Sequence, residues 1–144
     1  MPLAPPVLLA GLVDIFNNPF NSEAEAAQAW ANAFKKYMTP LAIPPPTNPQ
    51  RHALAAKAMQ AALVGMSAPG AGVVTLQKGF TVYAATVALN SAPISVPPPA
   101  PLILPAFPPT SDPVSVASAI TTAVSTWIIT GTFTIPPAPP IPWA

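Results

Sequence analysis

The chain has 144 residues, of which 24 are proline, and only five basic and four acidic side chains, with a formal net charge of +1. This length suits one domain with a buried core, and the weak net charge excludes electrostatic capture of nucleic acid or of an anionic membrane surface. Cysteine is absent, which excludes disulfides, thiolate metal sites and cysteine nucleophiles.

A first short helix is predicted directly after the N-terminal prolines. Pro5 and Pro6 suit its first turn, where a backbone N–H has no helical partner in any case. Asn17, Asn18 and Pro19 end it. The residues that then fall near one face are Val7, Leu8, Gly11, Leu12, and Ile15 or Phe16.

The second helix has the clearest start signal in the chain. Ser22 followed by Glu25 is a capping box, in which the hydroxyl and the carboxylate satisfy free backbone N–H groups. Phe20 before the cap is placed to pack against Ala26, and Pro40 ends the helix. Its apolar face repeats at intervals of three and four, at Ala26, Trp30, Ala33, Phe34 and Tyr37.

A third helix follows an extended segment. Pro44-Pro45-Pro46 favours polyproline II, and Asn48-Pro49 is an N-cap followed by a first-turn proline. The helix is predicted from about Pro49 to Met66, and residues 69–72 form a turn. Its expected close-packing face consists of Leu54, Ala58, Ala61 or Ala62, and Gly65.

The segment Val73 to Asn90 carries two conflicting signals. Many of its residues are β-branched and favour a strand. Its length of about 18 residues favours a helix, because strands are usually shorter than ten residues. A helix is the preferred interpretation, with a face of Leu76, Phe80, Tyr83, Val87 and Asn90.

Residues 92–111 form a long uncharged segment in which apolar side chains stand between prolines. A solvated linker would carry polar residues instead, so we expect this segment to lie in a groove of its own helices or of a neighbour. Asp112-Pro113 then opens the last helix, which runs to about Thr130 and ends with Gly131 as a C′ glycine. Its face consists of Val116, Ile120, Ala123 or Val124, and Trp127.

The chain closes with Thr132 to Ile135, whose alternating pattern is compatible with a short strand, and with a proline-rich tail that carries Trp143. Chain ends are usually disordered unless something holds them. Trp143 is therefore expected to be an anchor, since aromatic residues dominate interface energies and a pre-extended arm loses little entropy on docking. A pocket on a neighbouring chain is the preferred site; docking on its own domain and a free tail are the alternatives.

No catalytic or metal-binding pattern is visible. Glu23, Glu25 and Asp112 stand at helix starts, where capping explains them. His52 is the single histidine; it lies beside Arg51 in a first helical turn, and we expect it on the surface. A metal site needs more ligands than this, and no base is placed to activate a serine or threonine. We therefore expect no enzyme activity, no metal and no cofactor.

A membrane span deserves consideration because the mean hydropathy is +0.49. The best candidate, Val114 to Ile135, is interrupted by many serines and threonines and has no flanking basic anchor. The N-terminus lacks the basic region of a secretory signal. The sequence therefore predicts neither a spanning helix nor a cleaved signal.

Several short motifs resemble small Ala/Pro-rich virion proteins of tailed bacteriophages. They are Phe16-Asn17-Asn18-Pro19 at the end of the first helix, Ala29-Trp30-Ala31 in the second, and Thr126-Trp127, Thr130-Gly131-Thr132 and Pro142-Trp143 near the C-terminus. The resemblance implies a non-enzymatic role in the tail, baseplate or neck, or as capsid decoration, and hence location in a virion assembled in the host cytoplasm.

Together these observations predict an all-α fold: a bundle of four or five helices over residues 1–131, with an extended C-terminal arm over residues 132–144. The expected function is that of a structural subunit that bridges other structural proteins of its assembly, with homo-oligomeric symmetry and with no nucleic acid, membrane or small-molecule substrate as partner. The alternatives are a capsid decoration protein, a secreted or cell-envelope binding module, and a membrane-active protein. The predicted interface residues are Ile94, Val96, Leu102, Ile103, Leu104, Phe107, Ile135, Ile141 and Trp143.

Overall fold

A computed structural model describes residues 3–17, 22–41, 49–64, 72–89, 94–104, 112–134 and 138–143. The predictions for Phe20, for the polyproline segment at residues 44–46 and for the end of the third helix at Met66 lie outside the described residues, as do the interface candidates Phe107 and Ile135.

The described chain is mainly helical, which confirms the predicted all-α class. The helices are α1 (Pro5–Asn17), α2 (Glu23–Met38), α3 (Pro49–Ala62), α4 (Gly72–Leu89) and α5 (Pro113–Ile128). Three short strands, β1 (Ile94–Val96), β2 (Thr132–Thr134) and β3 (Ile141–Pro142), form a small sheet. The conflict between strand and helix propensities in residues 73–90 is resolved as the helix α4.

Two predicted N-caps form as expected. The Ser22 hydroxyl accepts a hydrogen bond from the Glu25 backbone N–H at 3.2 Å. An Asp112 carboxylate oxygen accepts one from the Ser115 backbone N–H at 3.1 Å. Each cap satisfies a donor that a helix start leaves without an intrahelical partner, so α2 and α5 begin where the sequence predicts.

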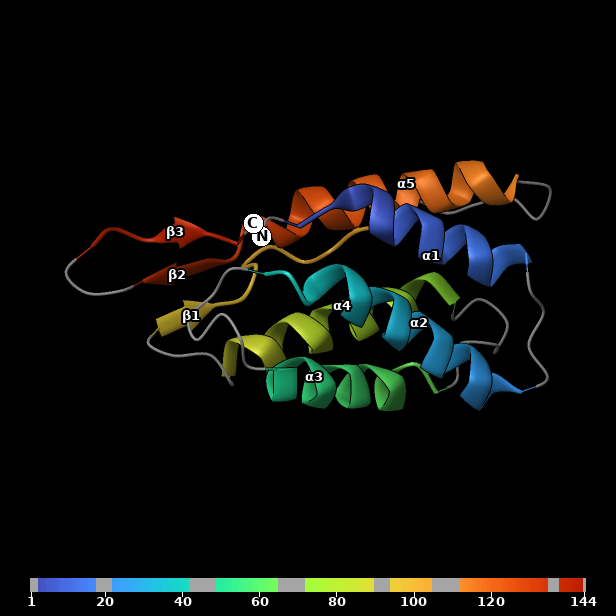
Figure 1. Ribbon diagram of the computed structural model, residues 1–144, viewed down its shortest axis with the longest axis horizontal. Helices are drawn as coiled ribbons and strands as arrows, with labels where there is room; N and C mark the ends of the chain where they lie inside the picture. The colour runs from blue at the N-terminus through green and yellow to red at the C-terminus, as the bar shows by residue number, and fades with distance from the viewer. Residues whose placement is uncertain are drawn as a thin grey trace.

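The helices pack in an order that differs from their order along the chain. α5 packs against α1, α1 against α2, α2 against α3, and α3 against α4 (Figure 1). Aromatic rings connect α2 with α4: Phe34 contacts Phe80 and Tyr83 edge to face, at centroid distances of 4.7 and 4.8 Å. Trp30 also contacts Phe80, so a continuous ring cluster forms the centre of the core.

The buried face of α3 differs from the prediction. Ala55, Met59 and Leu63 are buried on this face, whereas Leu54 is half exposed. The prediction was wrong because six of the 14 residues of α3 are alanine, so its faces differ little in hydropathy. Its partner decides the face: at Gly79 of α4, an added Cβ would lie 2.7 Å from Cδ2 of Leu63, so glycine allows the two helices to approach closely.

The sheet joins segments from both sides of α5. β1 precedes α5 and pairs antiparallel with β2, which follows α5, and β2 pairs antiparallel with β3. Paired residues share a face of a sheet, so Ser95, Phe133 and Ile141 lie on one face and Val96, Thr132 and Pro142 on the other. Figure 1 shows the sheet projecting from one end of the helical bundle.

Candidate interface

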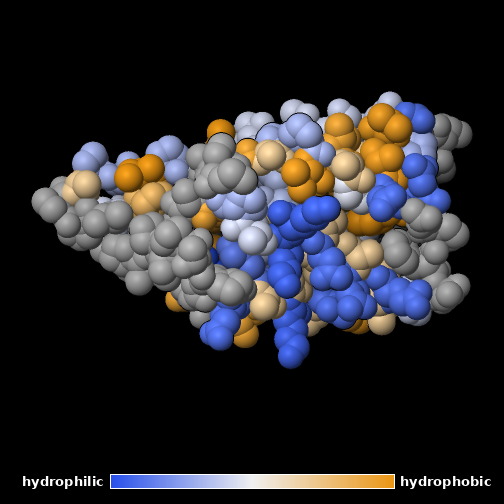
Figure 2. Space-filling model, viewed as in Figure 1, coloured by the Kyte–Doolittle hydropathy of each residue, from blue (hydrophilic) through white to orange (hydrophobic). Residues whose placement is uncertain are grey.

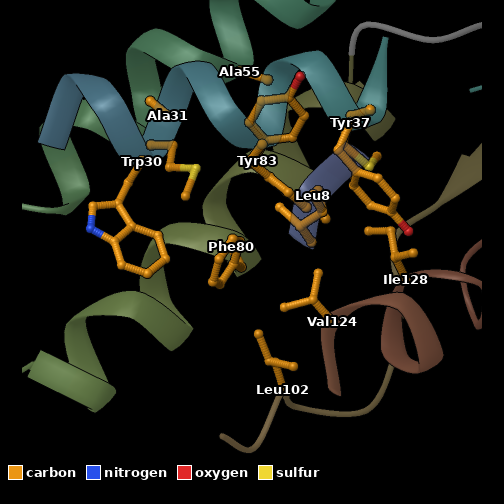
Figure 3. Close-up of a cluster of buried hydrophobic side chains, with 14 of the residues drawn as sticks. Leu8, Trp30, Ala31, Tyr37, Ala55, Phe80, Tyr83, Leu102, Val124 and Ile128 are labelled. Carbon is orange, nitrogen blue, oxygen red and sulfur yellow. The ribbon is translucent and has the colours of Figure 1, made fainter. Parts of the chain in front are cut away.

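The proline segment after β1 is fixed to its own helices. Nε1 of Trp127 on α5 donates to the Ala100 carbonyl at 2.7 Å, and the Leu104 backbone N–H donates to the Gln77 side-chain oxygen of α4 at 2.8 Å. Leu102 and Leu104 are buried, and Figure 3 shows Leu102 directed toward Val124 of α5. The described part of the segment therefore occupies a groove of its own bundle, one of the two predicted possibilities.

Ile103, between the two buried leucines, and one residue each of β1 and β3 are apolar and exposed. Ile103 is 75% exposed, Val96 on β1 is 47% exposed, and Ile141 on β3 is 42% exposed. Alternation of buried and exposed positions is what an extended backbone produces. Here both sets are apolar, so docking the segment on the bundle leaves a hydrophobic outer surface.

This outer surface also lacks charge. Every charged side chain of the protein belongs to α1–α4 or is Asp112, and none occurs in residues 79–111 or 113–144. We call the exposed residues of β1, 97–104, α5, β2 and β3 the charge-free surface. The outward side of α5 contributes hydroxyl groups, from Ser115, Ser118, Thr122 and Thr126.

Figure 2 shows part of this asymmetry on one face of the molecule. Strongly hydrophilic residues gather over α2, whereas the area over α1 and α5 mixes hydrophobic residues with more polar ones. Charged groups normally keep a surface soluble and free of contacts, so their confinement to one part of the molecule marks the other part as a candidate interface.

Trp143 is completely buried, within its own chain. Its backbone N–H donates to the Gly131 carbonyl at 2.8 Å, and its Nε1 donates to the Thr132 carbonyl at 3.1 Å. In the single chain Trp143 thus occupies the alternative predicted site, on its own domain, and not the preferred one on a neighbour. The physical reason is that β3 pairs with β2 and so brings Trp143 back to the C-terminal end of α5.

Gly131 has a different role from the one predicted. α5 ends at Ile128, and Gly131 does not adopt the left-handed backbone conformation of a C′ glycine. Instead, a Cβ added to Gly131 would lie 2.7 Å from Cδ2 of Trp143 and 3.0 Å from two further ring carbons. Glycine is required at this position because the indole ring covers its backbone.

A buried polar cluster at the start of α3 was not predicted. His52 is only 2% exposed, which corrects the expectation of a surface histidine, and its Nδ1 lies 2.9 Å from the Tyr83 hydroxyl. The neighbouring Arg51 is also buried, and its Nη2 donates to the Leu41 carbonyl at 3.4 Å. Tyr83 on the predicted inner face of α4 was the sequence signal for a buried polar partner, because its hydroxyl needs a hydrogen bond inside the core.

Burial governs the ionisation of this cluster. Burial, together with the positive charges of Arg51 and Lys35, lowers the pKa of His52 to about 4. Burial also raises the pKa of Tyr83 above its usual range and lowers the pKa of Arg51. At neutral pH the imidazole is thus neutral, and its contact with the Tyr83 hydroxyl joins the start of α3 to α4.

This pKa shift predicts a pH dependence of stability. Because the His52 pKa falls from 6.5 in the unfolded chain to about 4 in the fold, the unfolded state binds the proton more readily. The free energy of unfolding should be unaffected above about pH 6.5 and decrease by about 3 kcal/mol as the pH falls to about 4. Urea unfolding at several pH values measures this loss.

The matched control for that prediction is His52→Gln, which leaves every carboxylate of the chain in place. Subtracting its pH profile from that of the unmodified protein isolates the histidine contribution. Identical pH profiles for the two proteins would contradict the assignment of a buried, neutral His52.

No group of three or more histidine or acidic side chains that could hold a metal ion occurs within residues 3–143 outside the gaps given above. Among the helices that the structure describes, none combines the length and the hydropathy needed to cross a bilayer. No protein-family model, no curated protein and no solved structure matches the chain.

The nine predicted interface residues thus fall into three groups. Leu102, Leu104 and Trp143 are buried in their own chain. Val96, Ile103 and Ile141 are exposed on the charge-free surface. The backbone of Ile94 lies in β1, but the structure does not describe its side chain. Phe107 and Ile135 lie outside the described residues.

Proposed function

We propose that this protein is a non-enzymatic structural subunit of a large assembly and that the charge-free surface contacts its neighbours. The observation that carries this proposal is the outward-facing apolar set Val96, Ile103 and Ile141, on a surface formed by residues that include no charge. Val96 and Ile141 lie on opposite faces of the sheet, so both faces present an apolar side chain. A region that exposes large apolar side chains and carries no charge is a candidate interaction site.

The form of the surface also supports a role in assembly rather than in ligand binding. The side chains stand on a projecting sheet and on an extended segment that hydrogen bonds hold to α4 and α5. The extended segment 97–104, which these hydrogen bonds fix, loses little conformational entropy when a partner covers it. Such rigidity favours repeated, geometrically defined contacts between copies or with neighbouring structural proteins.

The kind of assembly that we propose is supported by the resemblance described above. The motifs Phe16-Asn17-Asn18-Pro19 and Pro142-Trp143 resemble small virion proteins of tailed bacteriophages, so we place the subunit in a virion, at the tail, baseplate or neck. In this role its partners are other structural proteins, and it needs no cofactor.

Substitution of Ile103 by aspartate tests the proposal. Ile103 is 75% exposed, so Ile103→Asp should leave the thermal unfolding midpoint almost unchanged while it places a charge in the interface. We expect at least a tenfold weaker self-association, measured by light scattering over a concentration series, because an unpaired buried charge opposes association.

Val64→Asp is the matched control. Val64 is also apolar and 68% exposed, and it lies in the turn after α3, outside the charge-free surface. It should associate like the unmodified protein. An unmodified protein that remains monomeric at high concentration would oppose the assembly role, and partition into liposomes would favour a membrane-active protein instead.

A further inference from the structure

The residues just after α5, Gly131 and Thr132, form a binding site for the side chain and backbone of Trp143. The site consists of the open backbone of Gly131, against which the indole of Trp143 packs, and of the carbonyl groups of Gly131 and Thr132, which accept the two N–H groups of that tryptophan. The indole is fully buried, and both the ring N–H and the backbone N–H of Trp143 are hydrogen-bonded, as a buried aromatic anchor requires.

The segment that delivers this anchor is otherwise exposed. Ala138, Pro139, Pro140, Ile141 and Pro142 are all exposed, and β3 pairs with β2 at only two positions. The attachment of the C-terminal segment therefore depends chiefly on Trp143. A segment held at one point can leave and return without disturbing the helical core.

The connection between β2 and β3 is unusually rich in proline. Residues 135–140 include Pro136, Pro137, Pro139 and Pro140. Proline favours extended polyproline conformations, which oppose the sharp reversal that a two-stranded hairpin requires. Connections of this kind favour exchange of the terminal element between copies, because an extended connection relieves the reversal.

We propose that the C-terminal segment 138–143 is exchanged between copies of this chain in the assembly. β3 and Trp143 of one copy then occupy the edge of β2 and the Gly131 site of a neighbouring copy. This inference rests on the proposed structural function and names a second copy of the chain as one partner. Every contact of the closed form is kept, so high local concentration of copies drives the exchange.

Paired cysteine substitutions test the exchange directly, because the natural chain contains no cysteine. Thr132 and Pro142 are register partners in β2 and β3. Directly opposed residues in an antiparallel pair have Cα atoms about 4.5–5.5 Å apart, within the range that a disulfide spans. We would co-express Thr132→Cys and Pro142→Cys in separate full-length chains that differ in mass by a tag, and oxidise the purified material.

Exchange predicts a disulfide-linked heterodimer of the two chains on a non-reducing gel, at a yield at least tenfold above the homodimers that each variant forms alone. The chain that carries both substitutions should form an internal disulfide when dilute and linked multimers when assembled. Light scattering on the same samples reports the assembly state.

Two results would overturn the exchange. If the co-expressed variants assemble without a heterodimer, while the doubly substituted chain forms only its internal disulfide, the segment stays in its own chain and the assembly role stands. If all variants remain monomeric at high concentration and only the internal disulfide forms, both the exchange and the proposed function are overturned.

Discussion

Replacing Trp143 with alanine is expected to lower the free energy of unfolding by about 3–5 kcal/mol, the range for truncating a large buried aromatic side chain. The indole is fully buried, and both its Nε1 and its backbone N–H have acceptors. Urea unfolding of the dilute protein, followed by far-ultraviolet circular dichroism, measures the change. In the absence of urea the helical signal should persist, because the aromatic centre of the core lies between α2 and α4.

Gly131 provides the control for this prediction. Gly131→Ala should also destabilise the protein, by about 1–3 kcal/mol, because the added Cβ would overlap a buried ring that has no space to move. In a chain that already carries Trp143→Ala, the same substitution should cost almost nothing, since the ring that it strikes is gone. Additive effects of the two substitutions would show that Trp143 does not pack on Gly131.

Phe34→Ala is expected to have an effect of similar size, about 3–5 kcal/mol. Phe34 is fully buried, stacks on Tyr37 at 5.8 Å, and contacts Phe80 and Tyr83 edge to face. Its loss removes buried apolar area and also the ring contacts that hold α2 on α4, so the cavity cannot close without moving a helix. Thermal and urea unfolding both measure this change.

Phe16→Ala is the matched control for Phe34. Phe16 lies at the end of α1, is only partly buried and contacts the ring of Trp30 at 5.6 Å. Its truncation should cost about 1–2 kcal/mol, because part of its area is already in water. Equal losses for the two variants would contradict the central position of Phe34 in the core.

The positions of the helices could be predicted from the sequence because their start and stop signals are local. Ser22 and Asp112 cap the next turn of backbone, and Pro5 and Pro113 occupy first-turn positions, whatever the rest of the chain does. Faces with strong contrast between large apolar and polar residues were also predicted correctly, as the burial of Phe80, Tyr83 and Val87 on α4 shows.

Other features depended on which elements meet, and local pattern could not reveal them. The buried face of α3 depends on the close approach of Gly79 on α4. Alanine side chains are small and tolerate both water and the core, so the alanine positions alone do not select a face. The burial of His52 depends on the Tyr83 hydroxyl, which lies 31 residues away in the chain. Composition indicated a candidate interface, but only the fold separated buried Leu102 from exposed Ile103.

The sequence by itself determined the helical class, the helix starts and the confinement of charge to one part of the chain, because these follow from local capping, proline geometry and composition. Only the tertiary structure decided where the chain end goes. Trp143 and Gly131 are separated by a proline-rich connection, and no local rule joins them. The pairing of β3 with β2 brings the indole onto the bare glycine backbone, so an anchor expected on a neighbour is found in its own chain.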